Sequence, residues 1–143
     1  MTEKFWLGVV QREHVLRGVA LGIAQVNHGS AAIKRVQPGD GFAFYSPKTS
    51  YPDGDPLREF TAIGRVADEP AWQGQDADSH PWRRRVEWDE RAASAPITPL
   101  LEVLELTRGN RNWGFIMRRG LVEVTHHDFA IIAHEMGSST LER

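Results

Sequence analysis

The stretch GFAFYSPKTSYPDGDPLREFTAIGRVADEP, residues 41–70, decides which fold this chain can form. Its first six residues put Phe42 and Phe44 on one side of an extended backbone, and Ala43 and Tyr45 on the other. Successive side chains of a β-strand point to opposite faces of the sheet, so this alternation is typical of a strand. The stretch therefore begins with a strand.

A second strand is expected after a loop. Residues 47–56 are rich in Pro, Gly and Asp and predict the loop, and residues 57–70 predict a long strand. Gly64 lies inside this strand, where a glycine often marks a bulge or a sharp bend. Further strands are expected over residues 4–10, 81–89 and 120–124.

Helical patterns are interspersed with these strands. Helices are expected over residues 12–22, 30–36 and 125–136, and a short helix around Leu100 to Leu104 within residues 96–106. Gly22 is a plausible stop for the first helix, and Ser30 has the side chain of an N-cap for the second. Thr125 and Asp128 have the spacing of a capping pair at the start of the last helix.

Strands and helices do not alternate strictly along the chain, which argues against a doubly wound parallel sheet. We therefore expect an α+β fold, a bent mixed β-barrel of five to six strands flanked by helices. A length of 143 residues suits one domain, which we assign to residues 1–137. Residues 138–143 are expected to form a frayed tail.

Composition excludes several classes of function. Hydrophobic residues make up 41% of the chain and charged residues 25%, as in ordinary globular proteins. The chain has no cysteine, which excludes disulfides, thiolate catalysis and cysteine-based zinc sites. We find no signal peptide and no apolar run of the roughly 18 residues that a membrane span requires. We expect a cytoplasmic protein that does not bind membranes.

Basic residues are unevenly distributed. The net charge is −2, so the chain as a whole gives no basic signal for nucleic acid. However, 14 of the 17 basic residues are arginine, and eight of these fall within residues 83–91 and 108–119. An arginine-rich face could bind phosphate groups. A solvated surface explains the same composition equally well.

The residues that would carry catalysis or metal binding are not in a recognisable pattern. His127 and His134 are seven residues apart, but the chain has no His-Glu-x-x-His pattern and no second cluster with ligand spacing. The chain also has no Gly-x-Ser-x-Gly stretch and no phosphate-binding glycine loop. We expect no metal and no cofactor, and we favour a protein that is not an enzyme.

Aromatic and amide side chains are more informative. A nucleobase is held by stacking on aromatic faces, while amide groups suit its polar edge. Gln25, Asn27, Tyr45 and Trp82 would supply these parts if they converge in the fold. The alternative is that the tryptophans are core residues with satisfied indole N–H groups. We favour that alternative for the tryptophans at positions 6, 72 and 88, and leave it open for Trp82 and Trp113.

Several segments occur in an order that resembles a known family. They are FWLGVV, QVNHGSAAIKRVQPGDGFAFYSP, FTAIGRV, PWRRRVEW, LELTRGNRNWGF and GLVEVTHHDFAII. Together they resemble the EVE-domain family of small prokaryotic proteins, in the PUA-like superfamily that also holds the YTH and ASCH domains. The resemblance covers residues 4 to 136 and implies a small, strongly bent β-barrel with helices packed around it.

The resemblance also implies a function and a site. EVE-like and YTH-like domains are regarded as readers that take a modified base into an aromatic-lined pocket. The positions of this sequence that match that pocket are Gln25, Val26, Asn27, His28, Tyr45, Ser46, Pro47, Trp82 and Trp113. The YTH relatives use a cage of two or three aromatic side chains, whereas here Trp82 and Tyr45 are the main cage candidates.

We therefore expect a non-catalytic nucleic-acid-binding reader. A flipped base, such as 5-methylcytosine in DNA, would stack on Trp82 or Tyr45, with Asn27 and Gln25 on its polar edge. The residues expected to bind flanking phosphates are Arg83, Arg84, Arg111 and Arg118. The expected partner is DNA in preference to RNA, with an effector protein acting in trans.

Two alternatives stay open. The first is an RNA-binding PUA-like module, which shares the fold and differs in its ligand. The second is a small hydrolase of a nucleoside or related metabolite that uses His28 with Asp40 or another pocket carboxylate.

Overall fold

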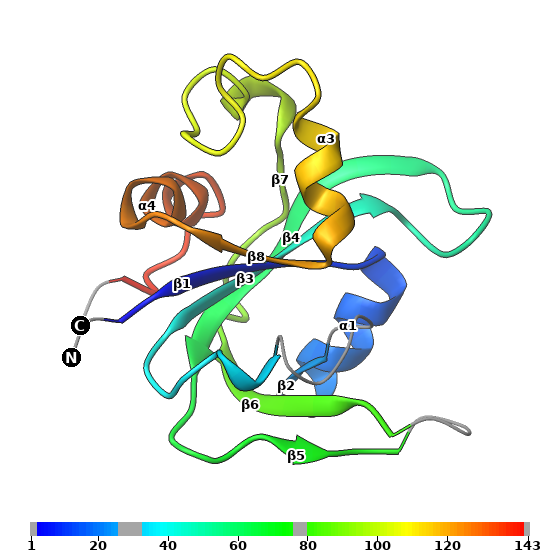
Figure 1. The fold of residues 1–143 in the computed structure, drawn as a ribbon, viewed down its shortest axis with the longest axis vertical. Helices are drawn as coiled ribbons and strands as arrows, with labels where there is room; N and C mark the ends of the chain where they lie inside the picture. Colours follow the sequence, from blue (N-terminus) through cyan, green and yellow to red (C-terminus); the bar gives the residue numbers. More distant parts are fainter. Residues whose placement is uncertain (1–2, 26–32, 76–79, 142–143) are drawn as a thin grey trace.

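The sheet of this protein is mixed and strongly curled (Figure 1). A computed structural model describes residues 3–25, 33–75 and 80–141. The hydrogen-bonded strand order is β2-β6-β4-β3-β1-β8, with β5 paired to β6 and β7 paired to β4. The strands are β1 (Phe5–Val9), β2 (Ile23–Gln25), β3 (Gly41–Lys48), β4 (Pro56–Val66), β5 (Trp72–Gln73), β6 (Trp82–Trp88), β7 (Ala95–Pro96) and β8 (Leu121–Val124). The pair β1–β3 is parallel and the others are antiparallel.

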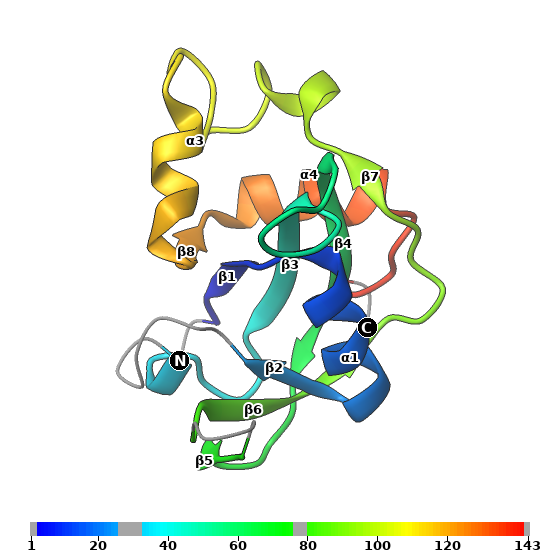
Figure 2. The ribbon, with the colours of Figure 1, turned by 90° about the vertical axis from the view of Figure 1, so that its right-hand side faces the viewer.

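Helices cover this half-barrel from several sides (Figures 1 and 2). The helical elements are α1 (Arg12–Leu21), η1 (Thr98–Leu100), α3 (Trp113–Ile116), η2 (Met117–Arg119) and α4 (His126–Glu135). The predicted α+β class, a bent mixed sheet flanked by helices, is confirmed. Within the described ranges, no helix is both long and apolar enough to cross a membrane.

Most of the predicted helices and strands are present in the structure, but its shortest strands were not predicted. α1 begins and ends within one residue of the prediction, and Gly22 caps it with φ 70°. α4 begins after Thr125, whose side chain accepts a hydrogen bond from the Asp128 N–H as predicted. The short helix expected around Leu100 to Leu104 is wrong, because this stretch holds the end of the 3₁₀ turn η1 followed by further turns. Strands β2, β5 and β7 are two or three residues long, too short for a periodic signal.

Gly64 lies in the long strand β4, but it does not form a bulge. The register shifts of the β3–β4 pair fall between Phe44 and Tyr45 and between Ser46 and Lys48. Gly64 instead pairs with Trp88 of β6, and a Cβ atom added to it would lie 2.9 Å from the Trp88 Cα. The glycine therefore permits a close approach of two backbones.

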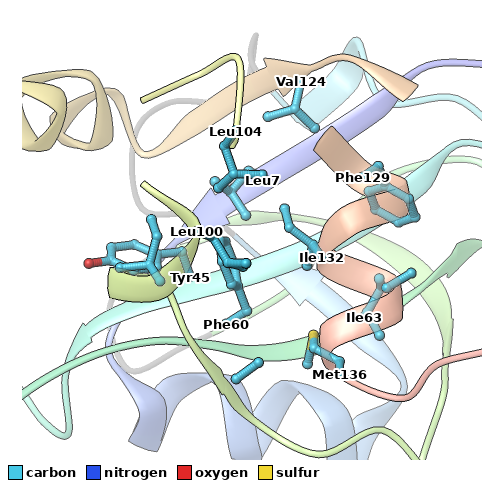
Figure 3. Close-up of a cluster of buried hydrophobic side chains, with 14 of the residues drawn as sticks. Leu7, Tyr45, Phe60, Ile63, Leu100, Leu104, Val124, Phe129, Ile132 and Met136 are labelled. Carbon is cyan, nitrogen blue, oxygen red and sulfur yellow. The ribbon is translucent and has the colours of Figure 1, made fainter. Parts of the chain in front are cut away.

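The sheet buries both of its faces. On the outer face, β-strand side chains pack against α4 and the residues around η1, as Figure 3 shows for one part of this outer core. Ala43 and Tyr45 belong to this core. Phe42 and Phe44 belong to a second, inner core inside the curl, which also holds Trp6. The alternation predicted for residues 41–46 is confirmed.

The end of the described chain is held in place. The Ser138 hydroxyl donates to an Asp89 carboxylate oxygen at 2.7 Å, and an Arg65 N–H donates to the Thr140 carbonyl at 2.7 Å. Leu141 packs against the outer core. Residues 138–141 thus contact the domain.

Candidate functional site

Strand β6 presents two different sets of side chains. Trp82 packs against the inner core, and Arg84 is buried two residues further along. Arg83 pairs in register with Gln25 of β2, so both side chains point to the opposite face. The arginine cluster predicted to bind phosphate is therefore divided between the inside and the outside of the curled sheet.

Trp82 is half-buried at the border of the inner core. The Lys34 ammonium lies over its ring, with Nζ 4.1 Å from the ring centroid. Lys34 itself is exposed. Within the described residues, the half-buried Trp82 ring thus has an exposed, solvated cation over one face.

Arg84 has a structural environment rather than that of a surface phosphate ligand. It is 6% exposed, and its guanidinium donates to the Glu69 carbonyl at 2.5 Å. Burial lowers the pKa of the Arg84 guanidinium, and the negative charge of Asp40 partly opposes this shift. The Arg84 Nε–H is buried and has no hydrogen-bond partner within the described chain. This burial and the bond to Glu69 do not favour a role for Arg84 in binding flanking phosphates, and that role stays a prediction.

Gln25 and Arg83 form a contact on the outer face. The Arg83 Nε–H donates to the Gln25 amide oxygen at 2.6 Å. Both line a small hollow of about 170 Å³ beside α1. Gln25 is 5% exposed and does not share a face with Trp82. The structure thus separates the amide of Gln25 from the ring it was expected to complement.

Tyr45 and Trp113 come together, but away from Trp82. Their ring centroids are 6.2 Å apart in an edge-to-face arrangement, and both belong to the outer core. Ser46 is buried and its hydroxyl lies 2.8 Å from the Thr61 hydroxyl. A cage built from Tyr45 and Trp82 is therefore not formed, because the two rings lie on opposite faces of the sheet.

Burial of Tyr45 predicts a pH dependence of stability. Burial raises the pKa of its phenol to about 12 from the ordinary value of 10.0, and the charge of Arg58 lowers it by a smaller amount. The folded protein prefers the neutral phenol, so this contribution is complete below about pH 10 and is lost as the pH rises towards 12. We expect a loss of about 2–3 kcal/mol across this range. Chemical denaturation between about pH 9 and 12 measures it.

The matched variants for this test are Tyr45→Phe and Tyr51→Phe. Tyr45→Phe should flatten the alkaline fall in stability, whereas Tyr51 is 79% exposed and its replacement should leave the fall unchanged. An identical alkaline fall in wild-type protein and Tyr45→Phe would contradict the prediction.

Three predicted pocket residues, Val26, Asn27 and His28, lie outside the described residues, and their roles stay predictions. The proposed partner of His28, Asp40, is described. Its carboxylate accepts from the backbone N–H of Lys4 at 3.0 Å, the indole N–H of Trp6 at 2.8 Å and the backbone N–H of Gln37 at 2.9 Å. Asp40 is 3% exposed and is committed to these donors, which does not favour a role as a catalytic base.

The remaining predicted residues lie elsewhere on the surface. Pro47 and Arg118 line a groove between β1 and α3, and Arg111 lies beside Trp113 in a separate hollow. Arg118 stacks on Phe115, with its guanidinium carbon 4.8 Å from the ring centroid. These arginines are exposed and can reach an anionic partner.

Glu105, His127 and Asp128 are close enough together to hold a metal ion, with one ligand atom of each lying within 4.8 Å of the others. The Asp128 carboxylate accepts the backbone N–H groups of Glu105 and Leu106 at 2.8 and 2.9 Å. His127 Nδ1 lies 2.9 Å from the same carboxylate. These hydrogen bonds hold the turn at Glu105 and Leu106 against the start of α4, a structural role that requires no metal ion.

Two residues of the Trp82 region were missed from sequence, Lys34 as the cation over the ring and Arg84 as a buried donor. The period-2 pattern of residues 82–88 holds the signal, because it puts residues 82, 84, 86 and 88 on one face. Lys34 comes from a distant stretch of the chain and has no local signal.

Solved structures with the same fold are known. An X-ray structure of a protein from Agrobacterium tumefaciens matches 95% of this chain and 94% of its own, with a TM-score of 0.59 and 13% sequence identity. An NMR structure of a protein from Rhodopseudomonas palustris matches 94% and 93%, with a TM-score of 0.55 and 15% identity. At these identities the likeness concerns the fold alone.

Sequence relatives are closer. A UPF0310 protein of Renibacterium salmoninarum is 49% identical over 137 residues, which cover 95% of this chain and 97% of that protein. The UPF0310 protein YdcG of Bacillus subtilis is 37% identical over 139 residues, covering 96% and 94%. The family model of the EVE domain matches residues 4–135. The chain therefore belongs to the EVE domain family.

Proposed function

We propose that this protein binds nucleic acid without catalysis and stacks one flipped base, such as 5-methylcytosine in DNA, on Trp82. Membership of the EVE domain family and the curled, PUA-like sheet support nucleic acid as the class of ligand. The observation that carries the proposal is the Trp82 ring itself, half-buried at the border of the inner core with Lys34 over its face.

The contact energies favour a base over the Lys34 cation on the face of the Trp82 ring. A cation over an aromatic ring at an exposed site contributes about 0.5–1 kcal/mol. A base stacked on an aromatic side chain contributes about 1–3 kcal/mol. Lys34 is exposed and long, so it can leave the ring at little cost and bind a phosphate of the incoming strand. The exchange converts one weak contact into two favourable ones.

The surroundings of Trp82 support the recognition of a methyl group on the base. The inner core beside the ring is apolar, since Phe42, Phe44 and Val86 belong to it. A methyl group in apolar surroundings is worth about 1–3 kcal/mol. Arg84 lies two residues beyond Trp82 on the same face of β6, but it is buried and is not offered to the base.

The test is the affinity of Trp82→Ala for single-stranded oligonucleotides that differ at one cytosine in its modification. We expect Trp82→Ala to bind the preferred oligonucleotide roughly 5- to 150-fold more weakly than the wild type, the equivalent of about 1–3 kcal/mol of stacking. Fluorescence anisotropy of labelled DNA and of the matched RNA measures this and shows whether the 2′-OH matters.

Trp72→Ala is the matched control. Trp72 is also half-buried and also has a cation near its ring, since the Arg85 guanidinium carbon lies 5.3 Å from the ring centroid. Trp72 pairs in register with Arg83, on the face opposite to Trp82, so its loss should leave the affinity unchanged. Equal binding by wild type and Trp82→Ala would sink the proposal.

A further inference from the structure

A groove of about 540 Å³ lies between the end of β1, the β3–β4 connection and the α3–η2 segment. These stretches meet on the right-hand side of Figure 1. Apolar side chains of Val9, Val10 and Met117 line it, together with the cationic side chains of Lys48 and Arg118. We call it the Lys48–Arg118 groove. Its volume suits a ligand of nucleotide size.

The electrostatics of the Lys48–Arg118 groove favour an anion. Its described lining has these two cations and no Asp or Glu. Gln11 also lines it and precedes the first turn of the ten-residue helix α1, where it makes no side-chain cap. The positive end of the α1 dipole therefore adds to the two cations.

Exposed aromatic rings lie in this groove and beside its cation Arg118. Tyr51 lines the groove and is 79% exposed, and Phe115, which contacts Arg118 outside the groove lining, is 69% exposed. Arg118 stacks on Phe115 and also lines a second hollow, of about 410 Å³, which that ring shares. Exposed rings beside cations form the kind of surface on which successive bases of a single strand stack while their phosphates bind the cations.

We propose that the Lys48–Arg118 groove binds the nucleotides that flank the base held at Trp82, in a single-stranded segment. This inference rests on the proposed function. One flanking base stacks on Tyr51 or Phe115, the apolar floor accepts its sugar, and the adjacent phosphates contact Lys48 and Arg118. The β3–β4 connection and the beginning of β6 lie on the same side of the molecule, which faces the viewer in Figure 2. One strand can therefore contact both regions.

The test compares two ligands that carry the same preferred base, a single nucleoside and a strand of about 12 nucleotides. The double variant Lys48→Glu, Arg118→Glu should bind the longer strand at least about tenfold more weakly. It should also reduce the magnitude of the slope of log K against log salt by about 1.4, since each phosphate contact on a single strand contributes about 0.7. Its affinity for the nucleoside, which has no flanking nucleotides or phosphates, should equal that of the wild type.

The charge-matched control is the double variant Arg91→Glu, Arg108→Glu. Both arginines are exposed and lie outside the groove lining, so the salt slope should stay close to that of the wild type. An unchanged affinity of the groove variant for the longer strand, with wild-type binding intact, overturns the groove alone. An absence of binding to either ligand by the wild type overturns the proposed function and this inference together. Loss of affinity equal to that of the control double variant also overturns the groove, because it would report net charge only.

Discussion

Replacing Asp40 with alanine is expected to lower the free energy of unfolding by about 3–5 kcal/mol. This carboxylate is 3% exposed and accepts three hydrogen bonds, two from backbone N–H groups and one from the indole of Trp6. Alanine would leave the buried indole N–H without an acceptor, at a cost of about 1–3 kcal/mol for that group alone. It would also remove the negative charge that favours the buried guanidinium of Arg84.

Urea denaturation followed by tryptophan fluorescence measures the effect, and two variants define its cause. Asp40→Asn keeps an acceptor oxygen but removes the charge, so its stability should fall between those of the wild type and Asp40→Ala. Asp53→Ala removes a carboxylate from the exposed β3–β4 connection and should change the stability by less than about 0.5 kcal/mol. A loss for Asp40→Ala no larger than that for Asp53→Ala would refute the role assigned to Asp40.

The strands that carry the fold could be predicted because their side chains alternate over enough residues. Phe42 and Phe44 face the inner core while Ala43 and Tyr45 face the outer core, as the period of two requires. Strands of two or three residues, such as β5, are too short for such a pattern. The helix expected around Leu100 was wrong for a different reason. Ile97, Leu100 and Leu104 are buried in the outer core, but turns that follow the surface of this core bring them there, without a helix.

The candidate site was predicted less well than the fold, although part of the missing information was present in the sequence. The alternation that assigns Tyr45 to the face opposite Phe44 also separates it from an inner-facing Trp82. Applied to residues 82–88, the same alternation puts Arg83 and Arg84 on opposite faces of β6, so the two side chains cannot bind the same nucleic-acid backbone. No local sequence pattern can predict a tertiary contact such as that of Lys34 with the Trp82 ring, because the two residues are far apart in the chain.

Gly64→Ala is expected to destabilise the protein by at least about 3 kcal/mol, because the methyl group would overlap backbone atoms of the neighbouring strand. The added Cβ would lie 2.9 Å from the Trp88 Cα and 3.0 Å from the Glu87 carbonyl carbon, and still closer to the Glu87 carbonyl oxygen. A flexible side chain could move aside at small cost, but a paired backbone cannot. β6 must therefore separate from β4 at this point.

This separation would reach the candidate site. In the described sheet, three register pairs beginning at Gly64–Trp88 join β4 to β6, and β6 in turn carries β2, β5 and Trp82. Gly114→Ala is the matched control, since its added Cβ meets no atom within 4 Å and α3 favours alanine over glycine. Thermal and urea unfolding should show a large loss for Gly64→Ala and none for Gly114→Ala. Wild-type stability in Gly64→Ala would mean that β4 and β6 do not approach as closely as the structure shows, and the position of Trp82 on the inner core would then need another support.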